Sequence, residues 1–385
     1  MSEHKLLEWG PLKRLVHSVL HAHDLRRRNS LFAYYRKFYT VEQLLSSLLD
    51  LVADDSSLGP RAEKAVRYWV NSYSELDFSA LKETEALQHV LDRMGLEFDL
   101  DFEEHCVFAS IRSWKLALLG ESDLDKVQDW RLSICSPKQF GDQLCLMDQR
   151  LFVLIQPFEF INYKWTSKVP CPNLAFFIHR FNELAYFVAS VILRQQNLCD
   201  CVSFLEFFIS VAISCLSRGN FHSYFSIMTG INLFPITRLK CLFEALSQDK
   251  QQFLQYFNEF NCLEDNNRTY RESVEKLILS GAPVVPHLAI HLRDINVLEQ
   301  SLSLKDSLES LFNDEIAFNR IVQVNEMVDR LTLLKNRCYE DLEEVSSIQL
   351  QIQKEFSQVL SERELSKLSY NMEPSHRRSA GRGVT

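Results

Sequence analysis

Glycine and proline are scarce in this chain, and this scarcity constrains the fold more than any other feature. Each occurs 10 times in 385 residues. β-Sandwiches and β-barrels need many tight turns, and such turns are rich in glycine and proline. The composition therefore predicts a mostly helical protein, and the length leaves room for two or three domains.

The overall composition is that of a globular protein with an acidic balance. Hydrophobic residues make up 46% of the chain and charged residues 24%, which is ordinary for a folded protein. The formal net charge is −9. An acidic surface repels the phosphates of nucleic acids and of anionic lipids, so we expect neither to be the main partner.

The cysteine pattern indicates a reducing compartment. The ten cysteines are irregularly spaced, and the close pair Cys199 and Cys201 lacks a second pair at zinc spacing. The amino terminus has no basic segment followed by an apolar run, which predicts no secretory signal. The apolar runs are shorter than the ~20 residues needed to span a bilayer. These features predict a cytoplasmic protein with free thiols.

Helical periodicity marks the amino-terminal region. Leu12, Leu15, Val16 and Leu20 follow the spacing that places side chains on one face of a helix. Thr40 precedes a leucine-rich run and is of the residue type that caps helix amino termini. We therefore expect a group of amphipathic helices here.

The helical period is nearly continuous from Ser136 onward. Ser136 and Pro137 form a typical helix start, and Leu144 and Leu151 lie on one face of the helix that follows. The segment 199–216 is apolar on nearly all sides, which predicts a central buried helix.

The segment Asn220–Lys240, which reads NFHSYFSIMTGINLFPITRLK, is the most patterned part of the chain. An apolar period through Phe225 runs to Gly230 and Asn232, and Pro235 is expected to end the helix. From the residues alone, Phe225 is expected in the core and Asn232 as a helix C-cap.

No motif of covalent catalysis or metal binding is present. The sequence lacks a phosphate-binding P-loop, a dinucleotide fingerprint, a zinc-protease helix and a serine-hydrolase elbow. His21 and His23 fall on opposite sides of a helix. His287 and His291 are four residues apart but have no third ligand near them, so we predict no metal site and no cofactor.

Several ordered motifs resemble those of Ras-type guanine-nucleotide exchange factors, the RasGEF family. The order Asn-Phe, Gly-Ile-Asn and Pro-Ile-Thr-Arg-Leu-Lys within 220–240 resembles the central signature of that family. Arg-Phe-Asn at 180–182 resembles the hallmark of the preceding helix, and the segment that ends at Pro374 resembles the closing motif. The resemblance covers about 136–374, and more weakly 31–73.

The resemblance implies an all-α fold. It implies a small helical accessory domain over 1–80, an acidic helical connection over 81–134 and a catalytic domain with a protruding helical hairpin over 135–375. A disordered basic tail would follow over 376–385. In such a protein the accessory domain would pack on the hairpin and brace it.

The resemblance also implies a function. Members of the family promote GDP release from small GTPases, so the implied partner is a Ras-like GTPase of the Ras, Rap or Ral type. Membrane contact would be indirect, through the lipidated GTPase. The family's pocket grips one switch of the GTPase, and the residues implied here are Phe225, Asn232, Tyr270 and His287, with His179 and Asn182 on the neighbouring helix.

The hairpin would open the nucleotide site of the GTPase. It would run over 285–304 and return over 316–334. An acidic tip imitates the departing phosphate, and Glu299 is the acid expected to do so. The implied catalytic positions on the hairpin are Asn296, Val297, Glu299 and Gln300, and Arg293 is an implied GTPase contact.

Three positions depart from the family pattern. His287 stands where the family has Phe or Tyr, Arg293 where it has Thr, and Gln300 where many members have Glu. They motivate an alternative, in which the chain keeps the fold as an exchange-inactive scaffold that binds a GTPase or another signalling partner. A helical adaptor with chance similarity is a second alternative.

Overall fold

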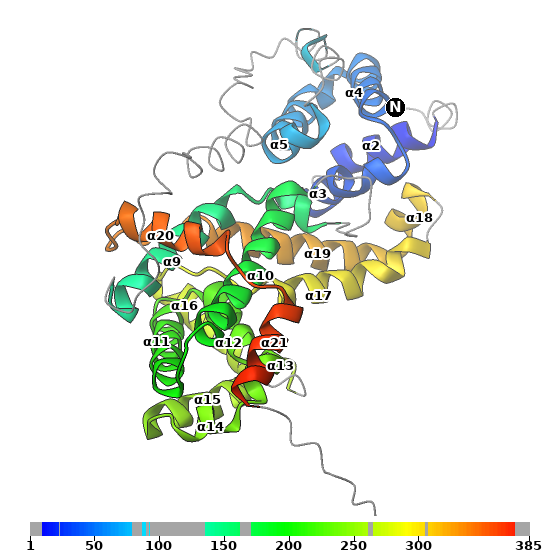
Figure 1. Ribbon diagram of the computed structural model, residues 1–385. Coiled ribbons are helices and arrows are strands. Elements are labelled where there is room, and N and C mark those ends of the chain that lie inside the picture. Colours follow the sequence, from blue (N-terminus) through cyan, green and yellow to red (C-terminus); the bar gives the residue numbers. More distant parts are fainter. Residues whose placement is uncertain are drawn as a thin grey trace, which may run out of the picture. The chain divides into compact units, whose positions relative to one another are not determined.

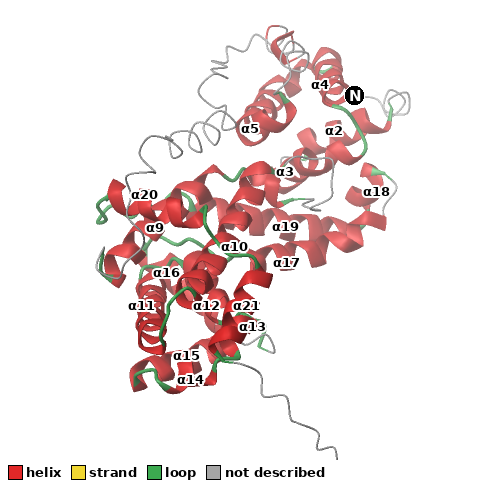
Figure 2. Cartoon of the chain, viewed as in Figure 1, coloured by secondary structure: helices red, strands yellow, loops and turns green. Residues whose placement is uncertain are grey.

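The computed structural model describes residues 10–22, 24–78, 87–89, 92, 135–161, 171–260, 265–304 and 307–373. Helices make up nearly all of these ranges, as Figure 2 shows. Within them no strand is present, and a single parallel β-bridge joins Asn220 to Val285. The all-α fold expected from the sequence is confirmed. Most of the predicted connection over 81–134 and all of the predicted tail over 376–385 lie outside the described residues.

The chain forms two compact units, and neither is continuous in sequence. The first, here called the accessory–hairpin unit, combines Met1–Arg112, Leu154–Leu174 and Ala289–Leu333. The second, the central unit, combines Ser113–Val153, Ala175–Leu288 and Leu334–Thr385. The amino-terminal helices and the hairpin therefore share one unit, although more than 200 residues separate them in the chain.

The accessory–hairpin unit consists of short and medium helices, labelled in Figure 1. Its amino-terminal elements are α2 (Pro11–His21), α3 (Leu25–Tyr34), η1 (Tyr35–Lys37), α4 (Val41–Asp54), η2 (Ser56–Leu58) and α5 (Gly59–Asp77). A 3-10 turn, η3 (Pro157–Phe160), packs against α5. The hairpin contributes α17 (Leu288–Gln300), η4 (Ser301–Leu304), α18 (Leu308–Asn313) and α19 (Glu315–Leu334).

Local sequence explains the amino-terminal helices. The predicted apolar face of α2 is buried, including Leu12, Leu15, Val16 and Leu20. Thr40 caps α4 in a full capping box, because its hydroxyl accepts from the Gln43 N–H and the Gln43 side chain accepts from the Thr40 N–H.

A buried charged group organises the core of this unit. Arg36 forms an ion pair with Asp77, and its guanidinium lies 4.6 Å from the ring centre of Tyr35 and 4.5 Å from that of Tyr73. The Trp69 indole N–H also donates to Asp77. Because a buried carboxylate is costly without partners, these donors together stabilise Asp77 in the interior.

The central unit is built around long apolar helices. They are α9 (Pro137–Leu154), α10 (Pro172–Leu193), α11 (Leu198–Ser217), α12 (Phe221–Ile231), α13 (Phe234–Thr237), α14 (Lys240–Glu244), α15 (Gln248–Phe260), α16 (Arg268–Ser280), α20 (Ser346–Phe356) and α21 (Glu362–Met372). α11 and α12 pack extensively against each other.

The end of α12 differs in detail from the sequence-based expectation. Gly230 lies inside the helix, and a Cβ atom there would come within 2.4 Å of the Ala185 carbonyl oxygen, so the glycine allows α12 to approach α10 closely. The helix ends at Ile231 with Asn232 as C-cap. Pro235 does not end α12 but lies in the first turn of α13.

Two helices correct the expectation about apolar length. α10 has 22 residues and α11 has 20, and both are long and apolar enough to cross a membrane by length and composition alone. In these helices 61% and 50% of the apolar window is buried inside the protein, which core helices also show. The prediction missed them because it considered uninterrupted apolar runs, whereas both helices contain scattered polar residues.

Candidate functional site

Three of the predicted site residues meet in an aromatic cluster in the central unit. The His287 ring stacks on Phe225 at 4.4 Å between centroids, with 17° between their planes. The Tyr270 ring meets Phe225 edge-on at 5.8 Å. The His287 backbone N–H donates to the Tyr270 hydroxyl at 3.1 Å. We call Phe225, Tyr270 and His287, together with Phe181, the aromatic cluster.

The members of this cluster differ in exposure. Phe225 is 3% exposed and Tyr270 is fully buried, whereas His287 is half-buried. A partner protein can therefore reach the imidazole ring more easily than either of the two aromatic rings behind it. Phe225 and Tyr270 act first as a base that fixes the orientation of His287.

Backbone pairing brings His287 to this place. The Phe221 N–H donates to the Val285 carbonyl at 2.9 Å, and the Val285 N–H donates to the Gly219 carbonyl at 3.0 Å. These bonds pair the segment before α17 with the chain that enters α12. Two residues after Val285, the His287 side chain consequently reaches Phe225 in the second turn of α12.

A buried polar network holds the start of α12. The Asn220 side chain accepts from the Ser223 N–H as a helix cap at 3.1 Å and donates to Asp148 on α9 at 2.8 Å. The Ser223 hydroxyl also donates to Asp148. Burial raises the pKa of Asp148, while Arg180 and these two donors oppose that shift. The network ties α9 to the helix that carries Phe225.

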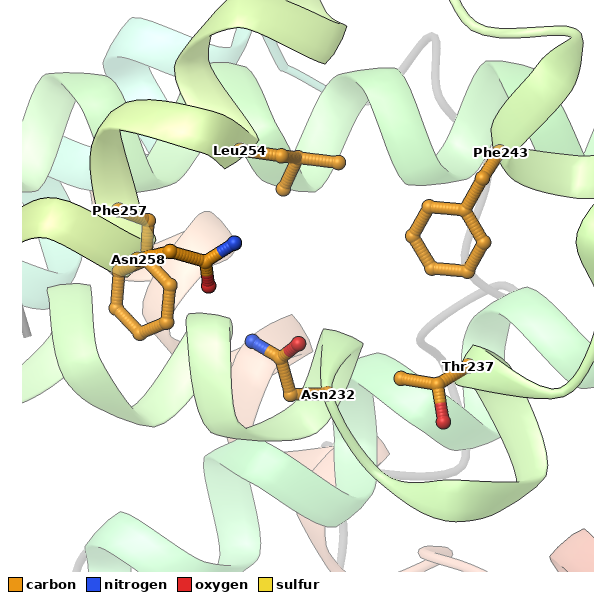
Figure 3. A pocket seen from close by; sticks show the side chains of 6 residues that line it. All are labelled: Asn232, Thr237, Phe243, Leu254, Phe257 and Asn258. Carbon is orange, nitrogen blue, oxygen red and sulfur yellow. The ribbon is translucent and has the colours of Figure 1, made fainter.

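Asn232 lies at the other end of α12 and lines a cavity. Its amide donates to the Met228 carbonyl at 2.9 Å, as suits a C-cap. The cavity has a volume of about 270 Å³ and is lined by Asn232, Thr237, Phe243, Leu254, Phe257 and Asn258. Figure 3 shows the amides of Asn232 and Asn258 turned toward each other beside apolar walls. We call it the amide-lined cavity.

The amide-lined cavity and the aromatic cluster share a wall. The Phe257 ring lines the cavity and lies 6.1 Å from the Phe225 ring. Both features therefore belong to one continuous part of the central unit. This arrangement brings exposed Asn232 and half-buried His287 into the same region of the central unit.

α10 contributes less directly. The His179 side chain is 65% exposed, and its Nε2 atom lies 3.2 Å from the Glu183 carboxylate. Asn182 is exposed. Between them in the chain, Phe181 lies 5.3 Å from the His287 ring, so α10 reaches the aromatic cluster through Phe181 rather than through the two predicted residues.

A buried histidine was missed at this site. The centre of the His222 ring lies 3.8 Å from that of Phe177, with the rings tilted, and 5.5 Å from that of Phe181, edge-on. Burial, with a contribution from Arg180, lowers the pKa of His222 to about 3. Its place next to Phe221 in the apolar period of α12 was the available signal. The ring is neutral at physiological pH and supports the α10–α12 contact.

The hairpin places its predicted residues on different sides of α17. Arg293 and Gln300 are exposed, Val297 is 63% exposed and Asn296 is half-buried. Glu299, by contrast, is only 9% exposed. The acid expected at the tip is thus largely buried in this structure.

Within the described ranges, no group of three or more His, Cys, Asp or Glu side chains is arranged to hold a metal ion. The side chains that gather at the aromatic cluster and the amide-lined cavity are aromatic rings, amides, one leucine and a threonine hydroxyl. Such groups bind other molecules by stacking and hydrogen bonding, and they favour a role in recognition.

Part of the central unit and of the hairpin matches a known domain family. Residues 139–322 match the model of the RasGEF domain. The chain is 29% identical over 176 residues to the Ras-specific guanine nucleotide-releasing factor RalGPS1 of Danio rerio, covering 45% of this chain and 30% of that protein. It is 29% identical over 244 residues to Ras guanine nucleotide exchange factor Q of Dictyostelium discoideum, covering 63% of this chain and 18% of that protein.

The similarity to a third protein is longer. Ras guanine nucleotide exchange factor J of Dictyostelium discoideum is 24% identical over 315 residues, which is 72% of this chain and 38% of that protein. The chain thus spans well under half the length of each of these relatives. The matched domain includes the aromatic cluster, the amide-lined cavity and α17. The chain thus carries a match to the RasGEF domain over 139–322, and the relatives named above are Ras guanine-nucleotide-releasing or exchange factors.

Proposed function

We propose that this protein promotes GDP release from a Ras-like small GTPase of the Ras, Rap or Ral type. The observation that carries the proposal is the RasGEF match over 139–322, because this range contains both the aromatic cluster and the first arm of the hairpin. The protein acts by binding, without covalent chemistry, cofactor or metal. The partner is a protein and not a nucleic acid.

Accelerated release requires differential binding. A factor speeds the loss of GDP only if it binds the transition state for release, and the nucleotide-free GTPase, more tightly than the GDP-bound form. One surface must therefore hold the GTPase while another disturbs its nucleotide site. We assign the holding surface to the central unit and the disturbing surface to the hairpin.

The holding surface combines two kinds of contact. Half-buried His287 offers a ring face and edge, fixed by Phe225 behind it. Exposed Asn232, with Asn258 across the amide-lined cavity, offers amide donors and acceptors to a peptide backbone. His179 and Asn182 extend this surface along α10 as further GTPase contacts.

The hairpin surface that a partner meets is formed by one side of α17. Helical spacing places four residues on one face of α17, namely Arg293, Asn296, Val297 and Gln300. This face is apolar and hydrogen-bonding and has one basic residue. We propose that it acts on the nucleotide site by steric displacement and hydrogen bonding.

A second candidate function has specific support. His287, Arg293 and Gln300 depart from the family pattern, and Glu299 is buried. A hairpin whose Glu299 carboxylate is turned inward fits an exchange-inactive scaffold that still binds a GTPase or another signalling partner. In either case we propose a cytoplasmic protein that meets membranes only through a lipidated GTPase or another recruiting partner.

One experiment separates the two functions. Release of fluorescent GDP from a panel of Ras, Rap and Ral proteins is measured with and without the protein, and binding to each nucleotide-free GTPase is measured in parallel. We expect release from at least one GTPase to accelerate at least tenfold. Background release from every GTPase, together with measurable binding, would instead establish the scaffold.

A matched pair of variants tests the binding surface. Asn232→Ala removes an amide of the cavity and should weaken binding to the responsive GTPase about fivefold, the loss typical of one hydrogen bond. Leu198→Ala alters an exposed residue of α11 outside both site features and should bind normally. Equal affinity of the two variants would exclude the cavity from the interface.

A further inference from the structure

The environment of Glu299 points to a role inside the protein. The Tyr34 hydroxyl donates to Glu299 Oε1 at 3.1 Å, and this bond joins residues 265 positions apart. Tyr34 is fully buried and Glu299 is 9% exposed. Both belong to the accessory–hairpin unit. A carboxylate with so little exposure depends on its donors to remain charged in place.

The pattern of α17 explains why this acid faces inward. Glu299 belongs to a stripe of residues at helical steps of four and three, which continues from α17 into η4: Leu288, Leu292, Ile295, Glu299 and Leu302. The four apolar members of this stripe are at most 2% exposed. Glu299 therefore occupies a position on the buried stripe where an apolar residue is the usual choice.

The partner-facing side of α17 lies elsewhere. With about 100° of rotation per residue, Val297 points roughly 160° away from Glu299 around the helix axis. Val297 is 63% exposed. The Glu299 carboxylate cannot face the same surface as Val297 without turning the whole of α17.

The helix that holds Glu299 also contacts the returning arm of the hairpin. The Asn325 amide on α19 donates to the Ser30 hydroxyl on α3 at 3.0 Å. The Arg27 guanidinium, also on α3, lies 4.8 Å from the ring centre of Phe318 on α19. One helix, α3, therefore contacts both arms through polar side chains.

We propose that Glu299 is a positioning residue, held by Tyr34, and that it does not itself replace the phosphate in the GTPase. The bond fixes the rotation of α17 relative to α3 and so presents Arg293, Val297 and Gln300 outward. This proposal rests on the exchange function proposed above for the part that concerns rate. The link between α3 and α17 is a property of the protein alone.

Two substitutions of Glu299 separate the roles. Glu299→Gln keeps an oxygen that accepts from the Tyr34 hydroxyl but removes the charge. A positioning role predicts an exchange kcat within about twofold of wild type for Glu299→Gln and a loss of at least fivefold for Glu299→Ala, with KM for the GTPase nearly unchanged in both. A phosphate-replacing acid predicts that Gln is as damaging as Ala, and that result would overturn the proposal.

Substitutions of Tyr34 test the link without relying on exchange. Tyr34→Phe removes the donor, and Tyr35→Phe is the matched control, because Tyr35 is equally buried but its hydroxyl lies beside Asp77. Amide hydrogen exchange is measured across α17. We expect exchange in α17 to become at least tenfold faster in Tyr34→Phe and to change less than threefold in Tyr35→Phe.

GDP release tests the exchange function, and amide hydrogen exchange tests the link between α3 and α17 independently. If no GTPase responds to the wild-type protein, the exchange function is contradicted, and hydrogen exchange alone decides the link. Unchanged protection of α17 in Tyr34→Phe, with both variants folded by thermal melting, would overturn the positioning role whatever the exchange assay shows.

Discussion

The aromatic cluster and the α3–hairpin contact hold functional elements in place by different means. In the cluster, rings of Phe225, Tyr270 and His287 pack within one unit over a short backbone pairing. In the α3–hairpin contact, side-chain hydrogen bonds such as Tyr34–Glu299 join helices that are far apart in sequence. The apolar burial of the rings tolerates small shifts more readily than a hydrogen bond does, because a hydrogen bond fixes both direction and distance. The cluster is suited to holding a partner, and the contact is suited to setting an angle.

The largest expected effect comes from removing one side of the α3–hairpin contact. Deletion of residues 1–134 takes away α2 to α5, while Ile295 of α17 and Ile321 and Val324 of α19 are fully buried in the same unit. We expect the shortened protein to expose these side chains and to aggregate. Light scattering and thermal melting measure this. A soluble fragment that melts cooperatively at the wild-type temperature would show that the hairpin needs no support.

The next effect tests the base of the aromatic cluster. Phe225→Ala removes a ring that is 3% exposed, and the resulting cavity should lower the free energy of unfolding by about 3–5 kcal/mol. Urea denaturation measures the change. Phe234→Ala, at a position 63% exposed, is the control and should stay within about 0.5 kcal/mol of wild type. A small loss at Phe225 would mean that the cluster is not a packed base.

A third effect depends on pH and concerns the support of α10 by His222. Its folded-state pKa is lowered to about 3 from an ordinary value of 6.5. Below pH 6.5 the unfolded chain therefore binds a proton that the folded protein does not, so stability falls as the pH drops from about 6.5 to 3. The contribution is at most about 1.4 kcal/mol per pH unit.

The non-titrating variant His222→Gln isolates this contribution. Asp148, whose pKa is raised by burial, acts in the opposite sense, because the folded protein binds its proton at higher pH than the unfolded chain. Asp148 is present in both proteins, so its effect cancels. Denaturation curves at pH 4, 5, 6 and 7 should converge for wild type and variant as the pH falls. Parallel dependence on pH would contradict the buried neutral histidine.

The smallest expected effect concerns the hydrogen bond between Asn325 and Ser30, a second polar link of the α3–hairpin contact. Asn325→Ala removes the bond to Ser30 and should cost about 1 kcal/mol, the usual value of one hydrogen bond. Gln323→Ala, at an exposed position of α19, serves as control. The double variant Ser30→Ala with Asn325→Ala should lose little more than the single variant, as measured by thermal melting. Fully additive losses would show that the two side chains act independently.

Local features were predictable from the sequence, and long-range contacts were not. The spacing of Leu12 to Leu20 predicted a buried face of α2, and the residue type of Thr40 predicted a helix cap. The helix-capping place of Asn232 and the core place of Phe225 were also expected from residue type. These features depend on interactions within one helix or one turn, and such interactions can be predicted from residue type and spacing.

The orientation of Glu299 shows what the sequence alone did not provide. The resemblance implied an acidic tip at Glu299, and an acidic residue in a helix is usually solvated. The stripe of Leu292, Ile295 and Leu302 already pointed to the opposite side. The decisive information was the Tyr34 hydroxyl, which lies 265 residues away. Periodicity gives the buried face of a helix, but only the fold gives the partner that makes a buried acid stable.

The interleaving of the two units bears on how the chain acquires its structure during synthesis. Helices α2 to α5 leave the ribosome before the hairpin, and the residues that complete their unit end at Leu333. At about 5–20 residues per second, the early helices wait on the order of tens of seconds for their remaining packing partners. During that interval side chains such as Tyr34 lack their final contacts. We expect the nascent protein to depend on chaperones more strongly than a protein whose domains follow one another along the chain.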